Sequence, residues 1–227
     1  MIGEHPDAAT QQRAEPVVPA PPAVVSQLFN EYQDLLCRYV GWLAGAGTRR
    51  GLIGPREVPR LWGRHILNSI AMAEVLPQGA RLVDIGTGAG LPGLAVACIR
   101  PDLRVDLVES LQRRTEFLSE VVADLDLTEQ IHIVHGRAEH PGVVKAVGSS
   151  RFVTARAVAP LDRLVRWAFP LLESGGSLLA LKGSSAEAEI SRCRAALTRA
   201  RAVQIEILEC GVDWLDQPTR VVRIVRP

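Results

Sequence analysis

The stretch that most limits how this chain can fold is residues 81–93, RLVDIGTGAGLPG. It begins with a short apolar run of the kind that is buried in a parallel sheet. Glycines then interrupt the run, and residues 94–99 continue as an apolar segment with helical character. A strand, a glycine turn and a helix in this order let backbone N–H groups approach a ligand, because no Cβ stands in the way. The stretch predicts a ligand site at the end of a central strand.

The glycine turn is compatible with two kinds of ligand. It fits the dinucleotide fingerprint G-x-G-x-x-G, with an acid for the ribose about 20 residues further on; the residues are Gly88, Gly90, Gly93 and Glu109. Asp84, however, would place a negative charge against a pyrophosphate, and Pro92 has no N–H to donate to one. An acid here suits a ligand with a positive group, such as the amino-acid end of S-adenosylmethionine, and this ligand is favoured. A glycine-rich turn without any ligand is the third interpretation.

Composition indicates the class of protein. The chain has 227 residues, of which 47% are hydrophobic, and its net charge of +1 gives no general nucleic-acid signal. No apolar run reaches the ~20 residues of a membrane span, and the N-terminus does not resemble a signal peptide. The cysteines are widely spaced, as in a reduced protein without a disulfide or zinc framework; they are Cys37, Cys98, Cys193 and Cys210. We expect a monomeric cytoplasmic protein with no metal and no membrane contact.

The N-terminal third divides into two parts. Residues 1–22 are rich in proline and predict a disordered tail, and residues 23–77 form a helical region. Apolar residues from Val24 onward, Leu28 among them, recur at three-to-four spacing and predict one core-facing helix that ends at Gly45 and Gly47.

A second predicted helix follows the basic segment 49–56. Arg60, Arg64 and Asn68 are four residues apart and share one helical face, which is either simply solvated or a strip that faces phosphates. In the second case Trp62 would be available for base stacking. His65 suits a base, a ligand or a packed structural histidine, and taken alone the last is favoured.

The remainder, residues 78–227, alternates between strands and helices. Strands are expected near residues 82–85, 104–109, 131–135, 152–158 and 177–181, with helices at 111–124, 141–147, 161–172 and 185–201. Such β-then-α units predict a parallel sheet covered on both faces. Strands 203–209 and 220–225 have no helix between them and predict an antiparallel edge hairpin. This seven-stranded plan is that of a Rossmann-like α/β methyltransferase domain dependent on S-adenosylmethionine, and it strengthens the preference for the methyl donor.

The candidate cofactor residues follow the ends of four predicted strands, where ligands bind in open α/β sheets. Gly86, Gly88 and Gly90 give backbone access beside Asp84. Glu109 can accept both ribose hydroxyls, and Ala138 with Glu139 can flank an adenine ring. Arg156 would face the transferred methyl group or its acceptor.

Missing motifs narrow the chemistry. The place after the fourth strand reads RAVAP (residues 156–160), without the Pro-Pro-aromatic motif of amino-group methyltransferases. None of the four cysteines follows the fourth or fifth strand, where carbon-5 pyrimidine methylation would need a nucleophile. A ring nitrogen with a free lone pair, such as guanine N7, needs neither that motif nor a cysteine nucleophile. Positioning and electrostatic stabilisation are enough to catalyse its methylation.

Six motifs in order resemble one family, the bacterial small-subunit rRNA (guanine-N7) methyltransferases called RsmG or glucose-inhibited division protein B. They are RHILNS (64–69), VDIGTGAGLPG (83–93), RRTEFL (113–118), RAE (137–139), RAVA (156–159) and ALKG (180–183), within a resemblance that covers about residues 24–226. Residues 51–53 depart from an Asn-Leu-Thr stretch common in the family.

The resemblance implies methylation of guanine N7 in the decoding region of 16S rRNA, either in naked rRNA or in the assembled small subunit. It implies that S-adenosylmethionine contacts Gly86, Leu91, Ala138, Glu139 and Arg156, with Glu109 on its ribose. It places Arg64, His65, Asn68 and Lys182 on the RNA side of the cleft, where we add Arg60, and we expect Arg156, Lys182 and His65 to serve catalysis. Two alternatives remain: an NAD-dependent oxidoreductase, and a non-catalytic RNA-binding factor in ribosome assembly.

Overall fold

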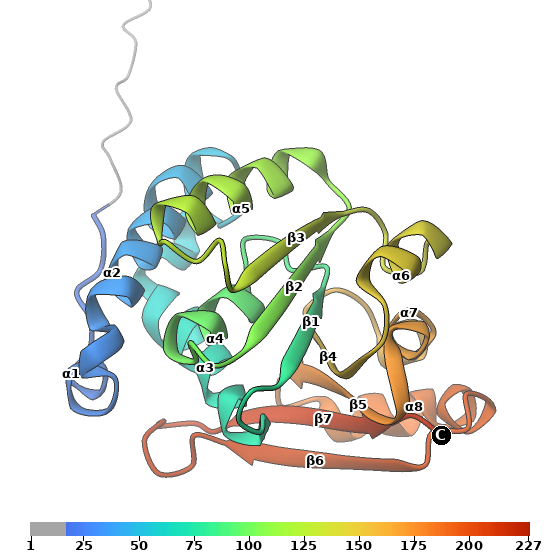
Figure 1. Cartoon of the computed structure of the whole chain (residues 1–227). Coiled ribbons are helices and arrows are strands. Elements are labelled where there is room, and N and C mark those ends of the chain that lie inside the picture. The colour runs from blue at the N-terminus through green and yellow to red at the C-terminus, as the bar shows by residue number, and fades with distance from the viewer. Residues whose placement is uncertain (1–16) are drawn as a thin grey trace, which may run out of the picture.

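The structure, a computed structural model, describes residues 17–227, which form one seven-stranded sheet in the order β3-β2-β1-β4-β5-β7-β6 (Figure 1). The strands are β1 (Arg81–Ile85), β2 (Arg104–Glu109), β3 (Ile131–His135), β4 (Ser150–Arg156), β5 (Leu172–Lys182), β6 (Gln204–Cys210) and β7 (Thr219–Val225). β1 to β5 are parallel, whereas β7 runs antiparallel to both β5 and β6. The predicted seven-stranded plan and its antiparallel edge are confirmed.

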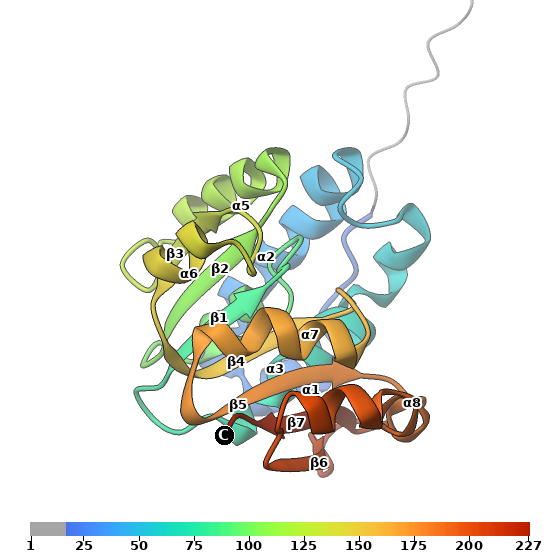
Figure 2. The ribbon, with the colours of Figure 1, turned by 90° about the vertical axis from the view of Figure 1, so that its right-hand side faces the viewer.

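Helices cover both faces of this sheet. In chain order they are α1 (Ala23–Leu28), η1 (Asn30–Tyr32), α2 (Gln33–Trp42), η2 (Leu43–Gly47), η3 (Pro55–Arg60), η4 (Leu61–Leu67), α3 (Asn68–Ala71), η5 (Met72–Val75), α4 (Gly93–Ile99), α5 (Gln112–Asp124), α6 (Pro141–Val147), α7 (Leu161–Ala168), η6 (Phe169–Leu171) and α8 (Ala186–Arg199). Figure 2 brings α7 and α8 to the front, with α7 over β4 and β5 and α8 packed beside α7. None of the helices in residues 17–227 is long and apolar enough to cross a membrane.

The sheet separates two hydrophobic cores because alternate strand residues point to opposite faces. Leu82 and Val105 belong to the core under the N-terminal helices, α4 and α5, whereas Val83 and Val108 belong to the core under α6, α7 and α8. The N-terminal helical region therefore shares one core with the sheet. The thiols of Cys98, Cys193 and Cys210 are buried within the described chain and Cys37 is half-buried, all four of them free.

The N-terminal helix differs from its prediction. Residues 17–22 have no helix or strand, residues 1–16 of the predicted tail lie outside the described part, and the chain from Val24 is broken at Phe29 into α1 and α2. The break coincides with an edge-to-face contact of the Phe29 ring on Trp214, 5.4 Å between centroids. Leu28 is 54% exposed, so its assignment to the core-facing stripe is wrong. Helical structure also continues through Gly45 and Gly47 as the π-helical segment η2.

The boundaries of β4 and β5 also differ from their predictions. β4 ends at Arg156 because Ala157 has a φ of +54°, which a strand does not allow. The helix predicted to end at residue 172 stops earlier, and β5 already begins at Leu172, so that the glycines taken as a helix end lie inside the strand. A Cβ on Gly176 would lie 3.1 Å from the carbonyl oxygen of Arg151, so glycine permits the close pairing there.

We predict that Gly93→Ala destabilises the fold although alanine is the better helix former. An added Cβ would lie 2.8 Å from both the Asp84 Cβ and the Leu107 Cδ2, and overpacking of this kind costs about 1–3 kcal/mol. Gly41→Ala in α2 is the control, because a Cβ there has nothing within 4 Å and removal of the glycine should stabilise by up to about 1 kcal/mol. Urea unfolding measures both, and a Gly93→Ala protein as stable as wild type would contradict the packing described.

Candidate active site

The turn after β1 depends on glycine at three positions. Gly86, Gly88 and Gly90 have φ values of +66°, +62° and +101°, a region that glycine enters without strain. A Cβ on Gly90 would lie 2.7 Å from the Tyr39 hydroxyl, and one on Gly86 would meet Val158 at 2.8 Å. At Gly88 a Cβ would meet only a backbone oxygen at 4.0 Å, so this part of the turn is open to a ligand.

Asp84 lies beneath this turn and closes it. Its Oδ2 accepts hydrogen bonds from the Thr87 hydroxyl at 2.6 Å and the Gly93 N–H at 2.8 Å. Its Oδ1 is buried and has no partner among the described residues. Burial raises the pKa of Asp84 to about 6, against the effect of both hydrogen bonds. The sequence predicts direct contact between this acid and the ligand. In the structure the carboxylate has no exposed surface, and its hydrogen bonds hold the turn together.

Glu109 ends β2 and is only 2% exposed. Its carboxylate accepts the Gly88 N–H at 3.0 Å and the Leu111 N–H at 2.9 Å, and it lies 3.4 Å from the Arg114 guanidinium. It therefore joins the turns that follow β1 and β2. The position agrees with the predicted ribose site, whose hydroxyls would compete with these backbone donors.

Ala138 and Glu139 lie in the loop after β3. Ala138 is buried, while the Glu139 side chain is 40% exposed and 4.0 Å from Arg137. A cavity of about 400 Å³ opens beside this loop, between the end of β3 and α6. The loop thus follows the strand next to β2, as the predicted adenine site requires.

These features fit a molecule such as S-adenosylmethionine. The open backbone at Gly88 and the carboxylate of Glu109 lie at the carboxyl ends of adjacent parallel strands, and the buried Asp84 holds the turn that presents Gly88. Leu91 is buried directly behind the turn. No cluster of side chains in residues 17–227 has the composition of a metal site.

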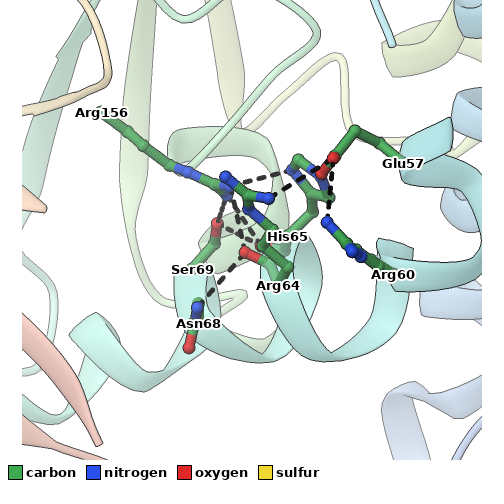
Figure 3. A network of polar contacts seen from close by, with 7 residues as sticks. All are labelled: Glu57, Arg60, Arg64, His65, Asn68, Ser69 and Arg156. Atoms are coloured by element: carbon green, nitrogen blue, oxygen red, sulfur yellow. Dashed lines mark hydrogen bonds and ion pairs between the residues drawn. The ribbon is translucent and has the colours of Figure 1, made fainter. Parts of the chain in front are cut away.

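Arg156 at the end of β4 is bound to the π-helical segment η4 and to α3 (Figure 3). Its Nη1 donates to the His65 carbonyl and the Ser69 hydroxyl, both at 3.1 Å. Its Nη2 donates to the Arg64 carbonyl at 3.0 Å and lies 2.8 Å from the His65 Nδ1. Arg156 therefore joins the sheet to the N-terminal helices as well as facing the candidate site.

His65 lies between Arg156 and Glu57. Its Nε2 is 2.9 Å from the Glu57 carboxylate, and its side chain is 13% exposed. Burial and the nearby Arg156 lower the pKa of His65, although Glu57 opposes them. The hydrogen bond to His65 lowers the pKa of Glu57 in turn. His65 is therefore neutral at pH 7 and belongs to a network, not to a packed apolar core.

The predicted basic strip is present but already paired. Arg60 and Arg64 lie 3.6 and 3.4 Å from Glu57, so an RNA phosphate would compete with this carboxylate for them. The Asn68 amide donates to the Arg64 carbonyl, and Thr219 donates to Asn68. Trp62 is 5% exposed and its indole N–H donates to the Pro19 carbonyl, so its predicted availability for stacking is wrong.

Lys182 at the end of β5 is held by an internal ion pair. Its ammonium donates to Glu189 at 2.8 Å and to the Ala159 carbonyl at 3.0 Å, and its side chain is 12% exposed. Glu189 also accepts the Leu161 N–H. The pair ties the loop after β4 to α8, and it leaves Lys182 little freedom to reach RNA.

A cleft of about 1290 Å³ lies at the carboxyl ends of β4 and β5. It brings together four of the predicted residues, Arg64, Asn68, Arg156 and Lys182, whereas Arg60 and His65 do not line it. The β6–β7 loop around Trp214 and the segment from Pro19 to Val24 form other walls. β4, whose end lines the cleft, pairs with β1, and this position suits the methyl acceptor.

Sequence reasoning missed two members of the network. Glu57 contacts three predicted residues, and its signal was present as the single acid within the arginine-rich residues 49–64. Ser69 shares the quoted motif with His65, but only the fold shows that its hydroxyl accepts from Arg156.

The fold and site define a class. Strand order, parallel β1 to β5 and an antiparallel β7 make this the Rossmann-like fold of the class I S-adenosylmethionine-dependent methyltransferases. A precorrin-6y C5,15-methyltransferase from Geobacter metallireducens is similar at a TM-score of 0.51 and 13% identity, over 77% of this chain and 90% of that one. A SAM-dependent O-methyltransferase from Thermotoga maritima has a TM-score of 0.51 at 16% identity, over 69% and 63%.

Sequence comparison gives the family. The protein-family model described as rRNA small subunit methyltransferase G matches residues 32–216 of this chain. The protein called ribosomal RNA small subunit methyltransferase G is 52% identical in Rhodococcus jostii, over 90% of this chain and 89% of that protein. Its Corynebacterium jeikeium counterpart is 45% identical over 99% of each chain. The chain belongs to the rRNA small subunit methyltransferase G family, which confirms the resemblance found in its motifs.

We predict that the buried Asp84 makes the cofactor-free protein less stable as pH rises. Because its pKa is about 6 when folded and near 4 when unfolded, the folded state holds the proton more tightly. The stabilisation is complete below about pH 4 and disappears as pH rises through 6, a change of about 3 kcal/mol. The difference in unfolding free energy between wild type and Asp84→Asn, measured from pH 4 to 7.5, should show this fall. A difference independent of pH would refute the assignment.

Proposed function

We propose that this protein transfers the methyl group of S-adenosylmethionine to N7 of a guanine in the decoding region of 16S rRNA. The observation that carries the proposal is membership of the small-subunit rRNA methyltransferase family across residues 32–216, a span that includes all the site residues expected from the sequence. S-adenosylmethionine supplies an electrophilic methyl group on a sulfonium ion. The reaction would take place in the cytoplasm, where the small subunit is present.

Most of the chain's own contribution is binding and orientation. The turn from Gly86 to Gly90, with Leu91 behind it, would take the cofactor by close backbone approach, Glu109 its ribose, and Ala138 with Glu139 its adenine. The cleft beside Arg156 would hold the guanine with N7 in line with the methyl group. Because N7 has a free lone pair, no side chain needs to remove a proton, and alignment with electrostatics carries the step.

The RNA side of the cleft is electropositive but constrained. Arg64 and Asn68 line the cleft directly. Arg60 lies next to the cleft and forms an ion pair with Glu57. RNA phosphates would exchange with Glu57 for these guanidinium groups, which makes binding salt-dependent. Lys182 would act through the field of its buried pair with Glu189 and not by direct contact. We propose that His65 acts through Arg156, which it contacts.

The oxidoreductase alternative has no support beyond the glycine pattern, because the family and the antiparallel β7 both indicate a methyltransferase. The non-catalytic assembly factor is disfavoured by the intact glycine turn and its open Gly88.

The first test maps N7-methylguanine in 16S rRNA from cells with the gene, without it, and with the gene restored. We expect one modified guanine in the decoding region to disappear on deletion and to return on restoration. Purified protein supplied with either extracted 16S rRNA or small subunits lacking the modification then shows which of the two is the substrate. An identical map in all three strains would refute the proposal.

The second test separates the cofactors. We predict that S-adenosylhomocysteine raises the unfolding midpoint and that NAD does not, because only a ligand of the folded state stabilises it. Glu139→Ala should weaken S-adenosylhomocysteine binding by about tenfold without a change in ligand-free stability, since its side chain is partly exposed on a loop. Glu129→Ala, at another exposed carboxylate, is the matched control. Stabilisation by NAD alone would instead support the oxidoreductase.

A further inference from the structure

The guanidinium of Arg156 uses its terminal hydrogens inside the chain. It has four terminal N–H bonds, and four acceptors receive them: the carbonyls of Arg64 and His65, the Ser69 hydroxyl and the His65 Nδ1. Three of these acceptors keep their lone pairs under all conditions. The fourth, the imidazole nitrogen, accepts only while it carries no proton.

This geometry settles the tautomer of His65. A guanidinium only donates, so Nδ1 at 2.8 Å from the Arg156 Nη2 must be the acceptor. The ring proton is therefore on Nε2, which donates to the Glu57 carboxylate at 2.9 Å. Figure 3 shows the resulting order, with the imidazole between the carboxylate and the guanidinium.

Glu57 is the acid of this network and Arg60, Arg64 and Arg156 are its cations. Without Glu57 only the contact with Arg156 would favour the Nε2–H form, because the Nδ1–H form would point a hydrogen at a guanidinium N–H. The imidazole would then turn away or displace Arg156 from the end of β4. Because Val158, two residues further on, packs against Gly86, a displacement there also reaches the glycine turn.

We propose that Glu57 is a positioning residue for methyl transfer: it fixes the His65 tautomer that holds the Arg156 guanidinium at the end of β4. The kinetic consequence of this proposal rests on the proposed function, whereas the assignment of the His65 tautomer does not depend on it. Glu57 does not itself line the acceptor cleft, although it pairs with Arg64, which does, and it acts on Arg156 through His65.

Protonation of His65 should undo the arrangement. It would put a hydrogen on Nδ1, which faces Arg156 of β4, and add a positive charge there. Arg64 on the same helical segment adds a further positive charge, and the carboxylate that faces His65 is Glu57 of η3. The charges of Tyr39 and Asp84 also act on Arg156, and both raise its pKa against the larger effect of burial. Activity should therefore fall as pH drops through the pKa of His65, which lies below its usual value.

The direct test is the ¹⁵N NMR spectrum of the ring nitrogens of the full-length protein. The chain has five histidines, and His65→Asn identifies the resonances of His65. We expect the Nε2–H form in wild type above pH 7 and a mixture of tautomers in Glu57→Gln, because a glutamine amide can donate to Nε2 as well as accept from it. A wild-type Nδ1–H form would overturn the proposal without reference to any activity.

The kinetic test compares wild type, Glu57→Gln and Glu120→Gln on 16S rRNA. Glu120→Gln is the matched control, since Glu120 also pairs with an arginine, Arg50 at 2.6 Å, but on α5 outside this network. We expect Glu57→Gln to lower kcat by about tenfold to a hundredfold through misplacement of Arg156, without raising KM for RNA. The acidic limb of its pH profile should move to lower pH, because the carboxylate that raises the His65 pKa is gone.

A structural role alone would change stability and leave the acidic limb in place. Wild-type kcat and an unmoved limb in Glu57→Gln would overturn the proposal. If wild type methylates no rRNA at all, the proposed function fails, whereas the tautomer of His65 still decides the role of Glu57.

Discussion

The structure depends on the closure of the first β–α turn around a buried carboxylate. The Oδ2 of Asp84 accepts from Thr87 within the turn and from Gly93 at the start of α4, so one oxygen holds both ends of the loop. Gly90 and Gly93 are required because Tyr39, Leu94 and Asp84 itself occupy the space of their side chains. The cost is a carboxylate in an apolar interior, which explains why its pKa is raised. Within the closed turn, the backbone at Gly88 remains accessible to a ligand.

A second connection determines where the acceptor can lie. Arg156 ends a central strand and binds carbonyls of a π-helical segment, a geometry that is often found at functional sites. In a similar way, the ion pair of Lys182 and Glu189 connects the loop after β4 to α8. Both cations are hydrogen-bonded within the chain, so they stiffen the walls of the cleft. Such rigidity suits a reaction that depends on alignment more than on proton transfer.

The alternation of strands and helices could be predicted from the sequence because each strand has its own apolar run and each turn its glycines. Element boundaries failed where tertiary contacts decided them, as at Phe29 on Trp214 and at Gly176 beside Arg151. Positions at strand ends were predictable from topology alone. The burial of Trp62 and the ion pair of Lys182 were not, because nothing in the spacing of these residues tells which partner the fold supplies.

The charges of the cleft show why a nearly neutral protein can be suited to RNA. Its net charge is only +1, and two arginines at the acceptor cleft, Arg64 in its lining and Arg60 next to it, share one carboxylate, Glu57. Internal pairing keeps their side chains ordered before RNA arrives, which reduces the entropy lost on binding. Because Glu57 is only partly buried and its pairs with Arg60 and Arg64 exceed 3.3 Å, phosphates can replace them without leaving a buried charge unpaired. Glu57 then retains His65, so RNA can take the outer arginines while Arg156 stays in place.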